Sequence, residues 1–246
     1  MLTLAYNQIQ RAGIMFNSKI TIDAFTTIPA VERFFKIEPA KKFIPQWFKQ
    51  VPSSVQAPVV EDMMIERPTI KQCVGFTDLY NKGFMLPLWS DVVIESNDNS
   101  IRWAFADMES KINSHPKEQM GKLVQGQVHV KLESPWKLKC NKKIDIVWQQ
   151  PSYNLITHFH KLHILPGVVN YSYQAGTNVN LMMVPNTRIE LEAGTPLVHL
   201  IPVTDKKVQI KCHLVDDKEY HYVSNRTLYP VFKNRYAKGM RKMMKE

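Results

Sequence analysis

The feature that most constrains the fold is a series of short, strand-like segments in the second half of the chain. Apolar and β-branched residues mark extended candidates at Asn178–Val184, Thr187–Leu191, Leu197–Val203 and Val208–Leu214. The separators are Pro185-Asn186, Ala193-Gly194 and Thr204–Lys207, and proline, glycine, asparagine and aspartate favour turns because of their backbone preferences. Short strands that recur at intervals of about 8–12 residues are typical of a sandwich or barrel. The sequence therefore predicts a mainly β fold with a β-sandwich or jelly-roll-like body.

Four further segments, which precede these in the chain, strengthen this prediction. Ser18–Thr27 and Gln127–Leu132 alternate apolar and polar residues, as a half-buried strand does. Val92–Ser96 and Ile101–Phe105 flank the sequence Asn-Asp-Asn-Ser, which is turn-forming by composition. We expect the latter two segments to form a hairpin.

The region between these strands is less regular. Pro45 is suited to start a short helical turn that uses Trp47 and Phe48 as anchors. Ser53–Pro58 is expected to be a loop. Ile70–Phe76 is expected to be extended, because it is rich in apolar and β-branched residues.

The length of 246 residues suits one β-rich domain. We expect residues 1–60 to form an N-terminal extension packed on a main domain of residues 61–246, with short helices and a C-terminal helix over residues 226–246. No apolar run approaches the roughly 18 residues of a membrane span. The N-terminus lacks the features of a secretory signal. A protein that is not secreted and does not enter a membrane is expected.

Cysteine content indicates the redox state of the thiols, and charge narrows the class of partner. The three cysteines are far apart, so they are expected to be reduced thiols. The net charge of +10 favours an anionic partner, but zinc-finger, RNP-like and helix-turn-helix patterns are absent. Nucleic-acid binding through aromatic and basic residues is therefore the weakest alternative. The densest basic run lies in the tail and is a candidate surface for docking onto an acidic partner. Its candidate residues are Lys233, Arg235, Lys238, Arg241 and Lys242.

A histidine cluster is the best candidate for a metal site. His158 and His160 share a face of an extended strand, and His199 lies further along the chain. Cupin-type jelly rolls bind metal through such a pair, a later histidine and an acid, for which Glu190 or Glu192 is available. The usual carboxylate shortly after the pair is missing. We therefore expect a protein without a cofactor, and a bound iron or zinc ion is the alternative.

Trp89 and Trp136, with His115, are candidates for a pocket, because indole combines a large apolar area with one N–H donor. The interpretation favoured over a pocket is that these tryptophans are core residues at strand ends. The compact signatures of dinucleotide, P-loop, hydrolase and metalloprotease sites are absent from the sequence.

Four sequence blocks carry a resemblance to a known family. They are Pro39–Lys49 (PAKKFIPQWFK), Thr69–Asp91 (TIKQCVGFTDLYNKGFMLPLWSD), Ser134–Trp136 (SPW) and Ala193–Val203 (AGTPLVHLIPV). As a set they resemble a family of tailed-bacteriophage proteins, notably of large marine myoviruses. The resemblance spans residues 39–236. It implies a phage origin and a β-sandwich-like or jelly-roll body, and it carries over no catalytic residues.

Two functions follow as hypotheses. The first is a non-enzymatic bacteriophage protein that is virion-associated or acts through contacts with phage or host proteins, in the host cytoplasm during infection or in the virion. The alternative is a cupin-like metal-dependent enzyme, such as an iron-type oxygenase, in which His158, His160 and His199 hold the ion.

Overall fold

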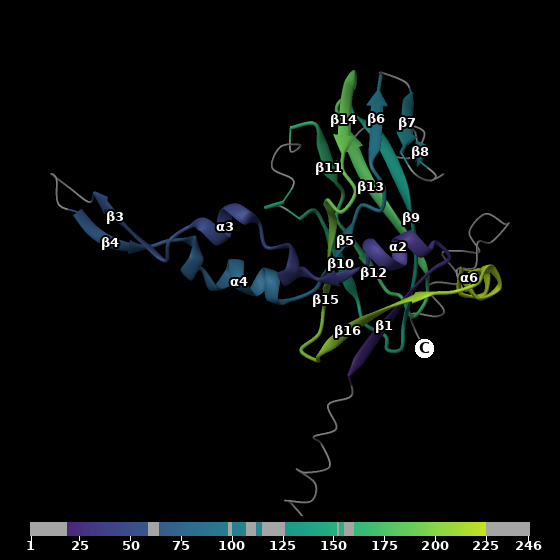
Figure 1. The fold of residues 1–246 in the computed structure, drawn as a ribbon, viewed down its shortest axis with the longest axis horizontal. Helices are drawn as coiled ribbons and strands as arrows, with labels where there is room; N and C mark the ends of the chain where they lie inside the picture. The colour runs from purple at the N-terminus through teal and green to yellow at the C-terminus, as the bar shows by residue number, and fades with distance from the viewer. Residues whose placement is uncertain are drawn as a thin grey trace, which may run out of the picture.

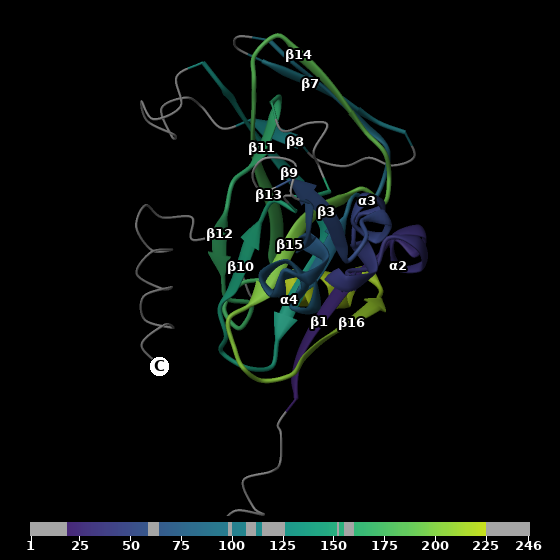
Figure 2. The ribbon, with the colours of Figure 1, turned by 90° about the vertical axis from the view of Figure 1, so that its left-hand side faces the viewer.

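The computed structural model describes residues 19–58, 64–97, 100–106, 112–114, 126–151, 153–154 and 160–224. These residues form a body of β-sheets and a narrow arm that projects from one side of it (Figure 1). Seen from the arm side, α3, α4 and β3 lie in front of the body (Figure 2).

The largest sheet of the body has six strands in the order β11-β13-β9-β1-β16, with β8 paired to β9 beside this path. Its strands are β1 (Ile20–Thr26), β8 (Ile112–Ser114), β9 (Val128–Cys140), β11 (Leu162–Ile164), β13 (Gly176–Met183) and β16 (Val208–Leu214). β1 pairs with β16 in parallel and with β9 antiparallel. Residues 20–26, from the segment expected to be an extension, therefore lie inside the main sheet.

A five-stranded sheet has the order β12-β10-β15-β5-β2, and a three-stranded sheet has the order β14-β6-β7. The five strands are β2 (Glu38–Pro39), β5 (Phe84–Pro87), β10 (Ile146–Gln149), β12 (Gly167–Val169) and β15 (Pro196–Pro202). The three strands are β6 (Val92–Ser96), β7 (Ile101–Phe105) and β14 (Thr187–Leu191).

One hydrophobic core joins these sheets. Along β9, buried residues alternate with half-buried ones from Val130 to Cys140, so one face of the strand points into the core. The cluster combines Leu132 and Trp136 of the six-stranded sheet with Leu200 of the five-stranded sheet. Two sheets that bury their inner faces against each other define a sandwich-like body.

The five- and three-stranded sheets are connected by one bent ribbon. β5 pairs with β15, and β6 pairs with β14. At the bend the Leu88 N–H donates to the Thr195 carbonyl at 2.8 Å, and the Gly194 N–H donates to the Leu88 carbonyl at 2.7 Å. Gly194 has φ +83°, a conformation that glycine adopts readily. The bend therefore lies where two of the sequence blocks, Thr69–Asp91 and Ala193–Val203, meet.

The helices are short. On the body lie α2 (Pro29–Phe34), the 3₁₀ turn η1 (Ala40–Phe43) and α6 (Asp217–Ser224). The arm contains α3 (Gln46–Gln50), a hairpin of β3 (Ser54–Pro58) and β4 (Met64–Pro68), the 3₁₀ turn η2 (Ile70–Gln72) and α4 (Val74–Asn81). No helix of the described ranges is long and apolar enough to cross a membrane.

The predicted fold class is confirmed, since the described chain is mainly β with a sandwich-like body, short helices and a helix in the C-terminal region. The hairpin of β6 and β7 and the helical turn after Pro45 are also confirmed. The segment predicted as a C-terminal helix, residues 226–246, lies outside the described residues.

Two local predictions are wrong. Ile70–Phe76 is not a strand, because η2 and the start of α4 occupy it, and the Thr69 hydroxyl accepts from the Lys71 N–H at the start of η2. Ser53–Pro58 is not a loop, because Ser54–Pro58 pairs with Met64–Pro68. The first segment begins with a local capping bond, and the second is a strand because it pairs with another segment.

Candidate functional site

The arm begins at an aromatic cluster, here called the arm root, that packs on the five-stranded sheet. Phe76 of α4 stacks on Phe48 of α3 with ring centroids 4.0 Å apart, and it also contacts Tyr80 and Tyr153. Trp47 closes the group, with its ring 5.9 Å from that of Phe76. Aromatic pairs in this distance range contribute about 0.5–1.5 kcal/mol beyond their area burial. The two short helices are therefore held together mainly by their aromatic side chains.

The arm root is also hydrogen-bonded to the body. The Tyr80 hydroxyl donates to Oδ1 of Asn154 at 2.7 Å, and Nδ2 of Asn154 donates to the Phe43 carbonyl at 2.7 Å. Burial raises the pKa of Tyr80, so its hydroxyl stays protonated and remains a donor. This chain of bonds fixes the direction in which α4 leaves the body.

His199 and Gly83 form the second attachment of the arm to the body. His199 is buried on β15, and its Nε2 lies 3.0 Å from the Lys82 carbonyl at the end of α4. A carbonyl accepts only, so the ring must carry its proton on Nε2. A Cβ on Gly83 would lie 2.4 Å from the carbonyl oxygen of Leu200 and 2.9 Å from His199. The backbone can approach the sheet this closely only with glycine at that position.

The middle of the arm is held by polar contacts. The Lys71 ammonium donates to the carbonyls of Lys49 and Val51, each at 3.0 Å, at the C-terminal end of α3. The Thr69 N–H donates to the Ser53 carbonyl at 3.0 Å, and the Gln72 amide donates to the same oxygen at 2.9 Å. These bonds join the two chain segments between the root and the hairpin.

The end of the arm, here called the arm tip, is the hairpin of β3 and β4. Its register pairs Val55 with Arg67 and Ala57 with Ile65, so these four side chains share one face. Val55 is 43% exposed and Ile65 is 39% exposed. None of the buried clusters among the described residues includes a member of β3 or β4. The tip therefore presents an apolar face with one arginine and has no core of its own.

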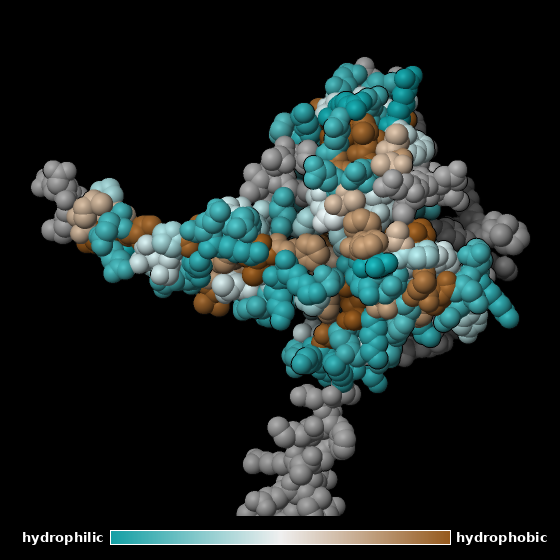
Figure 3. Space-filling model, viewed as in Figure 1, coloured by the Kyte–Doolittle hydropathy of each residue, from teal (hydrophilic) through white to brown (hydrophobic). Residues whose placement is uncertain are grey.

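Exposed apolar side chains gather along this arm. Figure 3 shows hydrophobic residues distributed along it between hydrophilic ones. Several of the exposed large apolar residues of the described chain belong to it: Val55, Met64, Ile65, Ile70 and Val74. Exposed apolar residues that collect on one projecting element mark a candidate interaction surface.

The described histidines that were predicted to bind metal belong to different parts of the fold, His160 to the turn before β11 and His199 to β15. His160 is exposed just before β11, at the edge of the six-stranded sheet. His199 lies on the five-stranded sheet, and its Nε2 bonds to the Lys82 carbonyl. His158 lies outside the described residues. Within the ranges that the structure describes, no three or more His, Cys, Asp or Glu side chains gather as metal ligands do.

The residues predicted to line a pocket are core residues where they are described. Trp89 and Trp136 are 1% and 0% exposed and belong to the main hydrophobic cluster. The Trp136 indole donates to the Phe35 carbonyl at 3.3 Å, and the Trp89 ring lies 6.4 Å from that of Phe105. His115 lies outside the described residues.

The basic residues predicted to dock a partner all lie outside the described residues: Lys233, Arg235, Lys238, Arg241 and Lys242. The cysteines are free thiols, as expected, with Cys73 exposed and Cys140 buried. Burial raises the pKa of Cys212 to about 11, so this thiol is a poor nucleophile at neutral pH.

Sequence reasoning missed the arm tip. Val55 and Ala57 alternate with the polar residues Ser54 and Gln56, and this period of two is a strand signal, whereas Met64–Pro68 shows no such alternation. Two prolines, Pro52 and Pro58, bound the first segment and favoured a loop.

Comparison of the chain with models of known protein families finds no matching family, and comparison with curated protein sequences finds no match. The site must therefore be interpreted from its own chemistry.

Proposed function

We propose that this chain is a non-enzymatic bacteriophage protein that works through protein contacts, with the arm tip as its docking element. The viral setting rests on the resemblance carried by the four sequence blocks. In this role the protein contacts other phage or host proteins, either in the infected cell or in the virion.

The observation that carries the proposal is the exposed apolar face of the arm tip. An isolated two-stranded hairpin is marginally stable in water, because it has no second layer on which to bury its side chains. Val55, Ala57 and Ile65 lie together on a hairpin that the aromatic root holds away from the body. A partner surface that covers this face would bury apolar area that the chain itself leaves in water.

Charge indicates the character of the partner. Arg67 lies on the same face as Val55 and Ile65 and is exposed. The chain as a whole carries +10, which disfavours contact with a second copy of itself. The partner that fits is a different protein with an apolar patch bordered by carboxylates, one of which pairs with Arg67.

Photo-crosslinking tests this proposal. A photoreactive amino acid replaces Ile65 in one variant and Val203 in another, since Val203 is an exposed apolar residue of the body. Both are produced in the infected host. We expect a discrete crosslinked partner from position 65, none from position 203, and at least a tenfold loss of the product when Arg67→Glu is added.

Three results would contradict the proposal. They are equal crosslinking from the two positions, crosslinking from position 65 to a second copy of the chain, and absence of any product from position 65. Because both variants change a surface residue, their folds are expected to be equally intact, which a thermal melt checks.

A further inference from the structure

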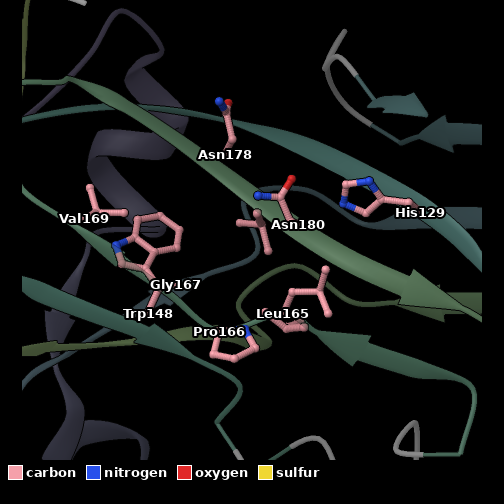
Figure 4. Close-up of a pocket in the computed structure, with 10 residues that line it drawn as sticks. His129, Trp148, Leu165, Pro166, Gly167, Val169, Asn178 and Asn180 are labelled. Atoms are coloured by element: carbon pink, nitrogen blue, oxygen red, sulfur yellow. The ribbon is translucent and has the colours of Figure 1, made fainter. Parts of the chain in front are cut away.

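A second feature, separate from the arm, lies beside β13 at the edge of the six-stranded sheet. A cavity of about 400 Å³ opens there (Figure 4). This volume falls in the range of about 300–1,000 Å³ that is usual for binding sites. Its described lining contains no Lys, Arg, Asp or Glu, although the chain is strongly charged. The titratable side chain of this lining is His129, and the other lining residues favour an uncharged occupant.

The cavity exists because β11 leaves the sheet early. β11 pairs with β13 only from Leu181 to Met183. The Leu165 N–H still donates to the Asn180 carbonyl at 2.8 Å, but Pro166 has no N–H with which to continue. The chain then crosses to the five-stranded sheet, where Gly167–Val169 pairs with β10. The strand position next to the first half of β13 is left open.

The backbone of β13 faces this open position. In an antiparallel ladder the N–H and C=O of one residue point to the same neighbour, and alternate residues point to opposite neighbours. Since the Asn180 carbonyl points toward the β11 side, the N–H and C=O of Asn178 point the same way. These groups therefore face the cavity, and no strand of the described ranges pairs with them.

The cavity lining has an apolar side and a polar side, which correspond to the two faces of β13. Val179, Ile164 and Trp148 belong to the buried core and give an apolar inner side. Asn178 and Asn180 project from the other side of β13 in the same direction (Figure 4). Neither amide side chain makes a hydrogen bond within the described part of the chain. The outer side therefore offers two amides, each able to donate and accept.

We propose that this edge binds an extended segment of a partner protein, which adds to β13 as the missing strand. Main-chain hydrogen bonds to Asn178 would hold the segment, and the two-sided lining would select its side chains. Residues facing inward would be aliphatic, to contact Val179 and Trp148. Residues facing outward would be uncharged and polar, to pair with Asn178 and Asn180. The site goes beyond the docking role of the arm and does not depend on it.

The test uses the full chain and the peptide acetyl-Thr-Val-Thr-Val-Thr-amide, with binding measured by calorimetry. When the peptide pairs antiparallel with β13, as β11 does, and its valines face inward, the threonine N–H groups point to β13 and the valine N–H groups point away. N-methylation of the threonines is expected to weaken binding about tenfold or more, and N-methylation of the valines less than about threefold. Both methylated peptides are tested with the unaltered protein, so a change in the folding of the protein cannot cause a difference between them.

A protein variant gives the second measurement. Asn178→Pro removes the side-chain amide and the N–H that faces the cavity, and Asn178→Thr is the matched control that removes the amide but keeps this N–H. We expect about a tenfold loss of affinity for the first variant and little change for the second, with hydrogen exchange slowed at Asn178 on binding to the unaltered protein.

Equal affinity of the two methylated peptides, no binding at millimolar peptide, or unchanged binding by a folded Asn178→Pro would overturn the proposal. So would a dimer in light scattering that Asn178→Pro dissociates, because a second copy would then occupy the edge. An Ile65→Asp variant at the arm tip is expected to bind the peptide normally, which separates this test from that of the docking role.

Discussion

The body and the arm bury their side chains in different ways. In the body, strands from distant parts of the chain share one core, and residues such as Leu132 and Trp136 are completely buried. In the arm, burial is confined to the aromatic root around Phe76, while Val55 and Ile65 at the tip remain exposed. The comparison shows that the arm is fixed at its base and gains little stability from its tip.

The difference has a functional meaning. A surface that contributes little to folding is free to be selected for binding, since its residues can change at small cost to stability. The apolar face of Val55, Ala57 and Ile65 fits that description. If the proposed docking role holds, substitutions in the body should lower stability, and substitutions at the tip should lower binding alone.

The largest effect is expected in the body. Trp136→Ala removes a fully buried indole and its hydrogen bond to the Phe35 carbonyl. We expect the free energy of unfolding to fall by about 3–5 kcal/mol, the usual cost of such a cavity. Urea denaturation measures it, and a loss below about 1 kcal/mol would show that this tryptophan does not hold the sheets together.

The next effect is expected at the arm root. Phe76→Ala removes the ring on which Phe48, Tyr80 and Tyr153 pack. We expect the packed arm to lose about 3 kcal/mol of stability relative to a locally unfolded arm, while the stability of the body stays the same. Limited trypsin digestion should cut at Arg67 and Lys71 much faster than in the unaltered protein, while the body fragment stays intact. Simultaneous digestion of the body would contradict the separation of the two regions.

A smaller effect is expected from pH at the junction between the regions. Burial lowers the pKa of His199 below 6.5, so it stays neutral in the folded chain while an unfolded chain takes up a proton. Stability is therefore complete above about pH 6.5 and falls as the pH drops toward the folded pKa. His199→Gln keeps a donor for the Lys82 carbonyl and removes this titration. The variant should lose less stability between about pH 7 and pH 5 in urea denaturation, and equal losses would exclude His199 as the cause.

The smallest effect on stability is expected at the arm tip. Ile65→Ser changes a side chain that is 39% exposed and belongs to no buried cluster among the described residues. The free energy of unfolding should change by less than about 0.5 kcal/mol. Urea denaturation of this variant and of Trp136→Ala under the same conditions measures both losses. A loss above about 1.5 kcal/mol would mean that the tip has a structural role.

Sequence patterns predicted the body better than the arm. The boundaries Thr187–Leu191 and Val208–Leu214 follow directly from apolar residues bounded by turn residues. In the first of these strands Ile189 and Leu191 are buried while Arg188 and Glu190 are exposed, which is the alternation that makes a strand recognisable in the sequence. In the arm, Phe76 and Tyr80 lie four residues apart on one face of α4, but the β-branched residues just before them favoured a strand. The contact that selects the helix comes from Phe48, in another segment.

The candidate sites were harder still to predict. Trp89 and Trp136 were singled out by residue type, and the structure places both in the core. Strand parity directs Trp136 of β9 inward, whereas Trp89 lies in the bend between β5 and β6. The open edge at Asn178 depends on where β11 leaves the sheet, which is a property of pairing. His160 and His199 were grouped by type and spacing, which do not show on which sheet a strand will lie.

Hydrogen exchange of the whole protein, followed by mass spectrometry, tests the central comparison most directly. Peptides from β9 and β13 are expected to exchange slowly, those from α3 and α4 at intermediate rates, and those from β3 and β4 almost as fast as an unfolded chain. That gradient would show that the arm is anchored at its root and open at its tip. Exchange in β3 and β4 as slow as in β9 would contradict the account, because the tip would then be stabilised without a partner.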